Sequence, residues 1–519
     1  MNRLRRFMLN GILMAGVTLA MRFVAVALNV YVSNSIGAVA MGLFTLITTV
    51  YGFGITFATS GINLATTRLV AEAIGDTSST KARSIPADRQ RLARAILWKC
   101  ILYALFFGGA ATVILLMLAE VIGCDILKDS RTVVPMQLLA ITFIPISVSS
   151  VLGGYFSAVR RVYKNAITQI LGQGIKIFSC IAFLRIFGVQ DTEAACIAVV
   201  CGILVAELAS LALNVLLYLF EKRSGENAQK PLGVLGRILS NALPLALSAY
   251  MRSALVTVEH ILIPQGLQKS GSSKDLSLAA YGTVSSMAFP LVLFPSAISA
   301  AFAGLLIPEI AESCATGDER RIKGMISTVI ETILIFSIGC AGVLTSFSLE
   351  LGKAVYPQSD SAGLYILLIA PLIPVMYLDT GVDAMLKGMG EHVYSMIVNV
   401  IDALASVILV AILLPKMGIL GYIVTVYFTE ILNAALSITR LLLRSHVKTH
   451  VILWVGRPLL CIIAATQGVS LFCNHLFCLD NVWLHIGISA VVYVLLLIPM
   501  GGIKPRVIAK SLKYMIGKA

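Results

Sequence analysis

The sequence lacks the short motifs that mark enzymes driven by nucleotides or by hydrolytic chemistry. It contains no Walker loop, no HExxH pair and no GxSxG turn, so it gives no support for ATP hydrolysis or for covalent catalysis. It also lacks the ten-residue segments of alternating hydrophobicity that are typical of transmembrane β-strands. We therefore expect neither an enzyme nor a β-barrel, and no cofactor.

Cysteines that could pair or bind a metal are scarce as well. Most of the ten cysteines lie inside apolar runs, where they behave as small hydrophobic side chains. Cys473 and Cys478 share a loop with His475, but a lone CxxxxC spacing is a weak signal for a metal site or a disulfide. We predict no metal site.

What the chain does contain is apolar sequence. Of its 519 residues 58% are hydrophobic, and the mean hydropathy is +0.91, whereas soluble domains have about 45–50% apolar residues with glycine included. Runs of the length that crosses a bilayer, about 20 residues, recur throughout. This predicts an all-α polytopic membrane protein with about fourteen transmembrane helices, at residues 8–32, 38–60, 95–119, 135–158, 166–187, 194–219, 239–262, 279–303, 325–348, 363–386, 394–414, 418–438, 451–472 and 483–503.

Positive charge is concentrated in alternate loops. The clusters lie at residues 81–94, 160–164, 221–230, 319–323 and 440–448, and the C-terminal tail is basic too. Because cytoplasmic loops carry the excess of Lys and Arg, both termini are predicted to be cytoplasmic. Topology and contact with anionic membrane lipid explain the net charge of +14, so no nucleic-acid partner is needed.

An internal repeat organises the chain. Residues 144–166 resemble residues 373–395, and Ala40-Met41-Gly42 corresponds to Ala280-Tyr281-Gly282. Six predicted spans separate the copies, so they have the same orientation, which is the parallel-repeat plan of transporters that rock two lobes about a central site. We predict an N-terminal six-helix lobe (1–222), a C-terminal six-helix lobe (223–448) and two added helices with a basic tail (449–519).

Two predicted spans carry arginine at membrane depth. Arg252 lies near the middle of the run at 239–264, with Glu259 seven residues later, and Arg22 lies in the first span with Asn29 at the same spacing. An arginine at a helix centre costs roughly 2.5–3.5 kcal/mol on insertion scales, so such residues usually face a cavity or the interior of a bundle. One interpretation is an Arg–Glu pair that joins helices. Two basic groups on two inward faces favour an anion site.

Further polar residues could extend this site. Lys176 and Gln173 in the fifth span add a cation and an amide. Asp379, Asp383 and Asp402 could couple an ion or bind sugar hydroxyls, with interhelical contacts as the alternative for each. Glu207 and Glu430, which the repeat relates, are interpreted as structural members of the two lobes.

Several of these segments resemble a known family. FPSAISAAFAGLLIPEIAE (294–312), PLALSAYMRSALVTVEHILIP (244–264) and the opening span with Arg22 are similar to the multidrug/oligosaccharidyl-lipid/polysaccharide exporter superfamily, in particular its polysaccharide-biosynthesis and stage V sporulation protein B-like branch. The resemblance implies a flippase for an undecaprenyl-pyrophosphate-linked sugar precursor, with Arg22 in its cavity. Related lipid II flippases carry an arginine and a glutamate in the eighth span, where this chain is apolar around Pro290 and Leu293. Arg252 could supply the missing charge.

The resemblance and the residues together define the hypotheses. A pyrophosphate needs convergent cations, and arginine supplies a fixed fork of donors. The leading hypothesis is export of a lipid-linked oligosaccharide or peptidoglycan precursor for wall, spore-cortex or polysaccharide synthesis, with wall-synthesis enzymes as candidate partners. The alternatives are a cation-coupled multidrug antiporter and a non-transporting scaffold for those enzymes. The antiporter would favour an acid in the first span, which has none.

The polyprenyl tail of such a substrate is expected to remain in hydrocarbon. Moving apolar surface into water costs about 25 cal/mol per Å², so a polar cavity cannot hold a long chain. The last two spans have no repeat partner and little charge. We predict that they form an apolar groove for the tail, which includes Leu459, Ile463, Val491 and Leu495.

Overall fold

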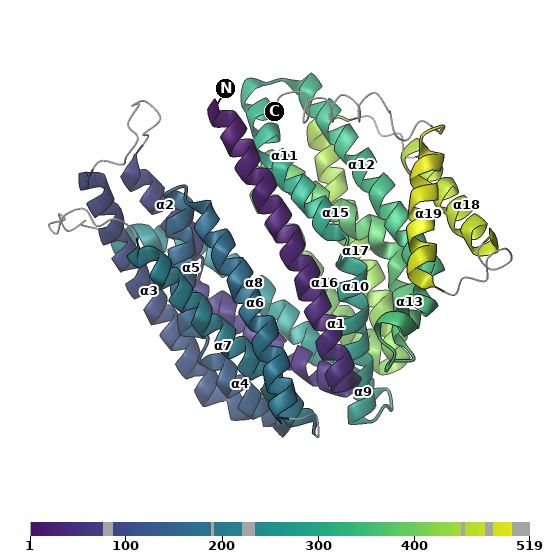
Figure 1. Cartoon of the computed structure of the whole chain (residues 1–519), viewed down its shortest axis with the longest axis horizontal. Coiled ribbons are helices and arrows are strands. Elements are labelled where there is room, and N and C mark those ends of the chain that lie inside the picture. The colour runs from purple at the N-terminus through teal and green to yellow at the C-terminus, as the bar shows by residue number, and fades with distance from the viewer. Residues whose placement is uncertain are drawn as a thin grey trace. The chain divides into compact units, whose positions relative to one another are not determined.

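A computed structural model describes residues 2–75, 87–187, 191–220, 234–447, 452–472 and 481–500 (Figure 1). Every regular element in these ranges is helical, which confirms the predicted all-α class. The chain divides into two compact units, of which the first comprises Met1–Gly282 and Val410–Pro415 and the second Thr283–Leu409 and Lys416–Ala519. The proposed lobe boundaries at 222 and 448 stay a prediction.

The first unit contains α1 (Asn2–Thr59), α2 (Ile62–Ile74), α3 (Ala87–Glu120), η1 (Val121–Ile126), η2 (Ser130–Thr132), α4 (Val133–Ala140), α5 (Phe143–Ala158), α6 (Val162–Phe187), α7 (Thr192–Leu219), α8 (Val234–Lys269) and α9 (Lys274–Gly282). The second contains η3 (Thr283–Ala288), α10 (Phe289–Leu293), α11 (Ser296–Thr316), α12 (Glu319–Ser346), α13 (Ser348–Val355), α14 (Ala362–Ile369), η4 (Ala370–Leu372), α15 (Ile373–Gly388), α16 (His392–Met417, apart from Val410–Pro415), α17 (Ile419–Ser445), η5 (Ile452–Gly456), α18 (Arg457–Phe472) and α19 (Val482–Leu497).

Ten helices in the described ranges are long and apolar enough to cross a membrane, or eleven if the bent pair Ser130–Ala140 and Phe143–Ala158 counts as one span. The chain is therefore a multi-pass membrane protein, and the count of fourteen stays a prediction. One reason for the smaller number is that the first two predicted spans count as one. They correspond to two helical segments of α1 that meet at a kink at Gly37, where φ is 79° and ψ is 172°. Another is that α19 has only 16 residues.

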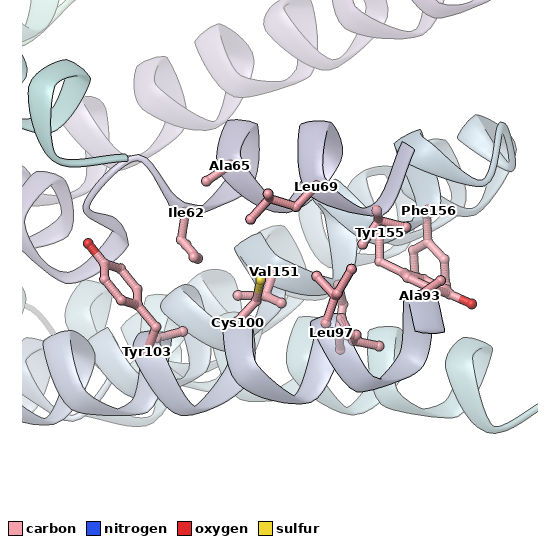
Figure 2. Close-up of a cluster of buried hydrophobic side chains, with 14 of the residues drawn as sticks. Ile62, Ala65, Leu69, Ala93, Leu97, Cys100, Tyr103, Val151, Tyr155 and Phe156 are labelled. Atoms are coloured by element: carbon pink, nitrogen blue, oxygen red, sulfur yellow. The ribbon is translucent and has the colours of Figure 1, made fainter. Parts of the chain in front are cut away.

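Small and apolar side chains hold the first unit together. Ile62, Leu69, Leu97, Val151 and Phe156 are buried where α2, α3 and α5 meet, as Figure 2 shows. Because lipid is as apolar as leucine, such helices associate through close packing and not through escape from water. Helices α1 and α8 contact the helices that form this cluster.

The closest approach in this unit is between α1 and α9. A Cβ atom on Gly42 would lie 2.0 Å from the carbonyl oxygen of Leu278, and one on Gly282 would lie 2.4 Å from that of Ala38. Small residues let membrane helices approach to backbone contact. Gly42 and Gly282 are the glycines that the sequence repeat relates, so equivalent points of the two repeats touch here.

Prolines interrupt the helices at the start of the second unit. The π-helix η3 precedes Pro290, and Pro295 follows α10. A proline leaves a carbonyl of the preceding turn without its helical partner, and in a membrane another donor must replace it. Two buried tyrosines donate to carbonyls next to those that the prolines free, the Tyr356 hydroxyl to the Met287 carbonyl at 3.1 Å and the Tyr377 hydroxyl to the Val292 carbonyl at 2.7 Å.

Replacing Tyr377 by phenylalanine tests this role. The Tyr377→Phe change removes one hydroxyl and leaves a buried carbonyl without its donor, which is expected to cost about 1–3 kcal/mol. Thermal unfolding of the purified protein should therefore move to lower temperature. Thr380→Val is the control on the same helix, because the Thr380 hydroxyl is exposed and donates only to its own helix at Met376; an equal shift in both variants would contradict the account.

Candidate functional site

Three of the predicted substrate-binding residues come together in the first unit. Asn29 of α1 and Gln173 and Lys176 of α6 line one cavity of about 160 Å³. Gln173 and Lys176 also line a neighbouring cavity of about 400 Å³, together with Glu207 and Ser210 of α7. Helix periodicity explains the gathering, because Gln173 and Lys176 at i and i+3 share one face of α6, and that face packs on α7.

Both cavities combine polar groups with apolar surface, and the smaller one is mainly apolar. Gln169 and Thr168 of α6 also line the larger one, and the Thr168 hydroxyl donates to Asn214 at 3.1 Å. Asn29 accepts a long hydrogen bond of 3.5 Å from Ser33. This arrangement offers amides, hydroxyls, one cation and one carboxylate, which suits a ligand that carries both phosphoryl oxygens and hydroxyl groups.

Arg22 is exposed on α1, one residue after Met21, which lines the larger cavity. Arg252 is exposed on α8, beside residues that face α1 and α2. Those neighbours are Tyr250, whose hydroxyl donates to Ser60 at 2.6 Å, and Ser253, which accepts from Thr56 at 3.4 Å. In the described ranges neither guanidinium forms an ion pair or a hydrogen bond, so both remain available to a ligand.

One interpretation of the sequence was an Arg–Glu pair, but Arg252 and Glu259 do not form an ion pair in the described structure. Seven residues along a helix correspond to a rise of about 10.5 Å, which separates the two groups. Glu259 is half-buried on the same helix. The next residue, His260, is hydrogen-bonded through Nδ1 to the Tyr281 hydroxyl at 2.6 Å and thereby joins α8 to α9.

The acidic residues proposed for ion coupling lie in the second unit. Asp379 and Asp402 are half-buried on α15 and α16. Asp383 is engaged by two partners, since Lys387 of the same helix lies 2.5 Å from its Oδ2 and the Ser395 hydroxyl donates to its Oδ1. An aspartate with an i, i+4 lysine is a common structural pair, so Asp383 has less capacity for an ion than the sequence suggested.

The four residues of the proposed tail groove are all exposed and apolar. Leu459 and Ile463 lie at i, i+4 on α18, and Val491 and Leu495 lie at the same spacing on α19. The other sides of these helices hold them to α12, because Ile462 fills the space above Gly342 and the Tyr493 hydroxyl donates to the Ile335 carbonyl at 2.6 Å. Figure 1 shows α18 and α19 side by side next to α12.

Two charged residues, one buried and one half-buried, lie in surroundings that the sequence did not predict. Lys164, which the sequence places in a basic loop, is only 6% exposed; its Nζ donates to the Leu217 carbonyl at 2.6 Å and lies 4.9 Å from the Phe156 ring centroid. Leu217 lies in the last turn of α7, where a cation is favourable. Glu207 was interpreted as structural, yet it faces a cavity. The sequence pattern within one helix does not show which neighbouring helix will contact a given side chain, and for this reason the surroundings of both residues could not be predicted.

A third group, Asp129, ties the end of α3 to the start of α9. Asp129 is 3% exposed and accepts from Arg131 at 2.8 Å, and Lys274 Nζ lies 3.2 Å from the same carboxylate. Burial alone disfavours the charged carboxylate, but the hydrogen bonds and charges of Arg131 and Lys274 outweigh it and lower the pKa of Asp129. The loop is therefore held by an ionised acid between two cations.

We expect Asp129→Asn to destabilise the protein by about 1.5–3 kcal/mol at pH 7, because two charge-assisted hydrogen bonds are lost. The pKa of Asp129 is lowered in the folded state, so this stabilisation is complete above the ordinary value of 3.8 and is lost as the pH falls below it. Thermal unfolding should separate wild type from variant at pH 7 and not at pH 2. Asp275→Asn, at an exposed partner of Arg131, should have a small effect at both pH values; a gap that persists in acid would contradict the account.

No group of three or more His, Cys, Asp or Glu in the described ranges could hold a metal ion. Cys473, Cys478 and His475 lie outside those ranges.

Comparisons with known proteins identify the family and the fold. The family described as "Polysaccharide biosynthesis protein" matches residues 7–314. Stage V sporulation protein B of Bacillus subtilis (strain 168) is 25% identical over 406 residues, which cover 76% of this chain and 75% of that protein.

Two solved structures share the fold. The lipid II flippase MurJ in an inward closed conformation has a TM-score of 0.70 at 13% identity, and the match covers 93% of this chain and 98% of that one. An inward-facing multidrug resistance MATE family transporter of the MOP superfamily has a TM-score of 0.66 at 15% identity, with coverage of 83% and 98%. At these identities the likeness shows the fold alone. A flippase and a drug transporter both have this fold, so the fold does not distinguish between the two functions.

Proposed function

Because the chain belongs to the polysaccharide biosynthesis protein family, we propose that it moves an undecaprenyl-pyrophosphate-linked oligosaccharide or peptidoglycan precursor from the inner to the outer leaflet of a bacterial plasma membrane. The observation that carries this proposal is the set of basic and amide groups at membrane depth in one unit. Arg22 and Arg252 are exposed and without ionic partners in the described ranges, and Lys176, Gln173 and Asn29 line adjoining cavities.

Each group has a chemical role in this proposal. The guanidinium forks of Arg22 and Arg252 bind pyrophosphate oxygens, and Lys176 adds a third positive charge. The amides of Gln173 and Asn29 donate to and accept from sugar hydroxyls. Exposed Leu459, Ile463, Val491 and Leu495 keep the polyprenyl chain in hydrocarbon. Alternating access then carries the headgroup across, while wall-synthesis enzymes consume the product outside.

A cation-coupled drug antiporter is the second candidate, since a MATE family transporter shares the fold. A cavity for cationic drugs is expected to be acidic, whereas α1 contains no Asp or Glu at all. In the first unit the cavity that holds Glu207 also holds Lys176, so its charges balance. The cavity is therefore not acidic, and the two further cations Arg22 and Arg252 favour an anionic substrate.

Reconstitution into liposomes distinguishes the two candidates. The full-length protein should move a fluorescent polyprenyl-pyrophosphate sugar between leaflets and should not transport ethidium. Ethidium transport without lipid movement would establish the antiporter instead. Failure of both, together with normal support of wall synthesis in cells, would identify a scaffold.

The proposed orientation has its own test. Cysteines introduced near Ser272 and Gln358 are expected to react with a membrane-impermeant maleimide added to whole cells, because these loops would be external. Cysteines near Arg89 and Lys230 should react only after the cells are opened, because the basic loops would be cytoplasmic. The reverse pattern would overturn the orientation and with it the direction of transport.

A further inference from the structure

Lys176 and Glu207 face the same cavity from neighbouring helices. Both line the space of about 400 Å³ between α6 and α7, with Gln173 and Ser210 beside them. In the described ranges neither side chain forms a hydrogen bond or a close ion pair. The ammonium group nevertheless acts electrostatically on the carboxylate, so Lys176 favours the ionised form of Glu207.

Of the other elements that pack on α7, α1 carries Arg22, which follows Met21 at the wall of this cavity. The charge that acts on Glu207 is nevertheless that of Lys176. From α1 Glu207 is faced by Tyr51, whose hydroxyl is hydrogen-bonded to Thr142 at 2.8 Å. Helices α4 and α5 contain no Asp, Glu, Lys, Arg or His, and Arg131 of η2 is already paired with Asp129. The ionised state of Glu207 therefore depends on Lys176.

This dependence matters when an anion enters the cavity. A phosphoryl group that binds Lys176 takes the positive charge that balances Glu207, and it also adds negative charge near the carboxylate. An ionised carboxylate without a counter-charge is strongly disfavoured at low dielectric, and a nearby like charge disfavours it further. The carboxylate relieves both costs by binding a proton.

We propose that Glu207 takes up one proton from water when a phosphate or pyrophosphate group binds at Lys176, and returns it when the group leaves. The proton leaves a hydronium ion of the solvent, whose O–H bond breaks, and adds to a carboxylate oxygen of Glu207; no other bond forms or breaks. This inference rests on the proposed function and deepens it, because it makes occupation of the anion site proton-linked. The group that binds the proton would then be Glu207 of the first unit, and not one of the aspartates of the second unit that the sequence suggested for ion coupling.

Isothermal titration calorimetry measures the linkage directly. The full-length protein in lipid nanodiscs is titrated with farnesyl pyrophosphate at pH 7 in two buffers of different ionisation enthalpy, which gives the protons taken up per ligand. Glu207→Gln should bind and should take up about one proton fewer than wild type. The wild-type affinity should also vary with pH more steeply than that of the variant, by up to about tenfold per pH unit. Subtracting the proton uptake of Glu207→Gln from that of wild type removes any change in the protonation of the ligand itself.

Two further variants sharpen the test. Glu430→Gln alters the glutamate that the repeat relates to Glu207 and should keep the wild-type proton count. Lys176→Met should bind more weakly and should also lose the extra proton, because Glu207 would already be protonated in the empty protein. This variant decides the question if Glu207→Gln fails to fold.

The outcomes separate the inference from the function on which it rests. Equal proton uptake by wild type and Glu207→Gln, with pyrophosphate bound by both, would overturn the proton linkage and leave the anion site intact. Absence of farnesyl pyrophosphate binding by wild type would overturn the anion site itself, and the inference with it.

Discussion

Replacing Arg22 and Arg252 together by alanine is expected to reduce flipping of a lipid-linked pyrophosphate by at least about a hundredfold. Each hydrogen-bonded contact with a charged group contributes about 1.5–3 kcal/mol, so two contacts correspond to roughly a hundredfold to ten-thousandfold in affinity. Folding should be little affected, because both side chains are exposed and neither has an ionic partner in the described ranges. The measurement is the rate of movement between leaflets in reconstituted liposomes.

The matched control for the double variant is Arg68→Ala. Arg68 is an exposed arginine of α2, paired with Glu72 at 3.0 Å in an i, i+4 arrangement, and such surface pairs contribute about 0–1 kcal/mol. It should therefore flip at the wild-type rate. If the Arg22→Ala, Arg252→Ala protein also does so, or if it restores wall or cortex synthesis in cells, the cavity charges are dispensable and a scaffold role is favoured.

The second large effect is expected from deleting residues 451–503. This removes α18 and α19, the surface assigned to the polyprenyl tail, and should abolish flipping while the rest of the chain still inserts and folds. The reason is that a tail without an apolar surface would be exposed in a polar cavity at about 25 cal/mol per Å². A truncated protein that flips a long-chain substrate at the full-length rate would show that the groove assignment is wrong.

Because the deletion also uncovers the face of α12 around Gly342, a gentler variant isolates the groove. Serine at Leu459, Ile463, Val491 and Leu495 leaves the contacts of Ile462 and Tyr493 in place. The control is serine at Leu404 and Ile408, an exposed i, i+4 pair on α16. Loss of long-chain flipping with retention of farnesyl pyrophosphate binding is expected for the first set only.

The helical architecture could be predicted from the sequence, because runs of about 20 apolar residues have few alternatives in a membrane. The repeat was also visible, since it relates Gly42 to Gly282. The contact between these two glycines could not be predicted, because a sequence repeat shows which residues are equivalent but does not show that they touch. That α1 and α9 touch at these two glycines is a property of the packing.

The site was predictable in part. Asn29, Gln173 and Lys176 were chosen for their polarity at membrane depth, and the structure brings them to adjoining cavities. Glu207 was assigned to structure because nothing along its own helix distinguishes it, while its partner belongs to α6. The pairing of Asp383 was predictable, since Lys387 lies four residues later on the same helix. Lys164 was interpreted as a charge of a basic cytoplasmic loop. Its burial could not be predicted, because it results from a contact with the last turn of α7.

The central claim is that the protein carries a lipid-linked sugar pyrophosphate across the plasma membrane, and depletion of the protein in its native bacterium tests it most directly. Lipid-linked precursors are extracted after depletion and assigned to a leaflet by their accessibility to an external enzyme. The account predicts that one undecaprenyl-pyrophosphate-linked precursor accumulates in the inner leaflet and that wild-type protein, but not the Arg22→Ala, Arg252→Ala variant, reverses the accumulation. Unchanged precursor levels in both leaflets, or accumulation on the outer side, would contradict it.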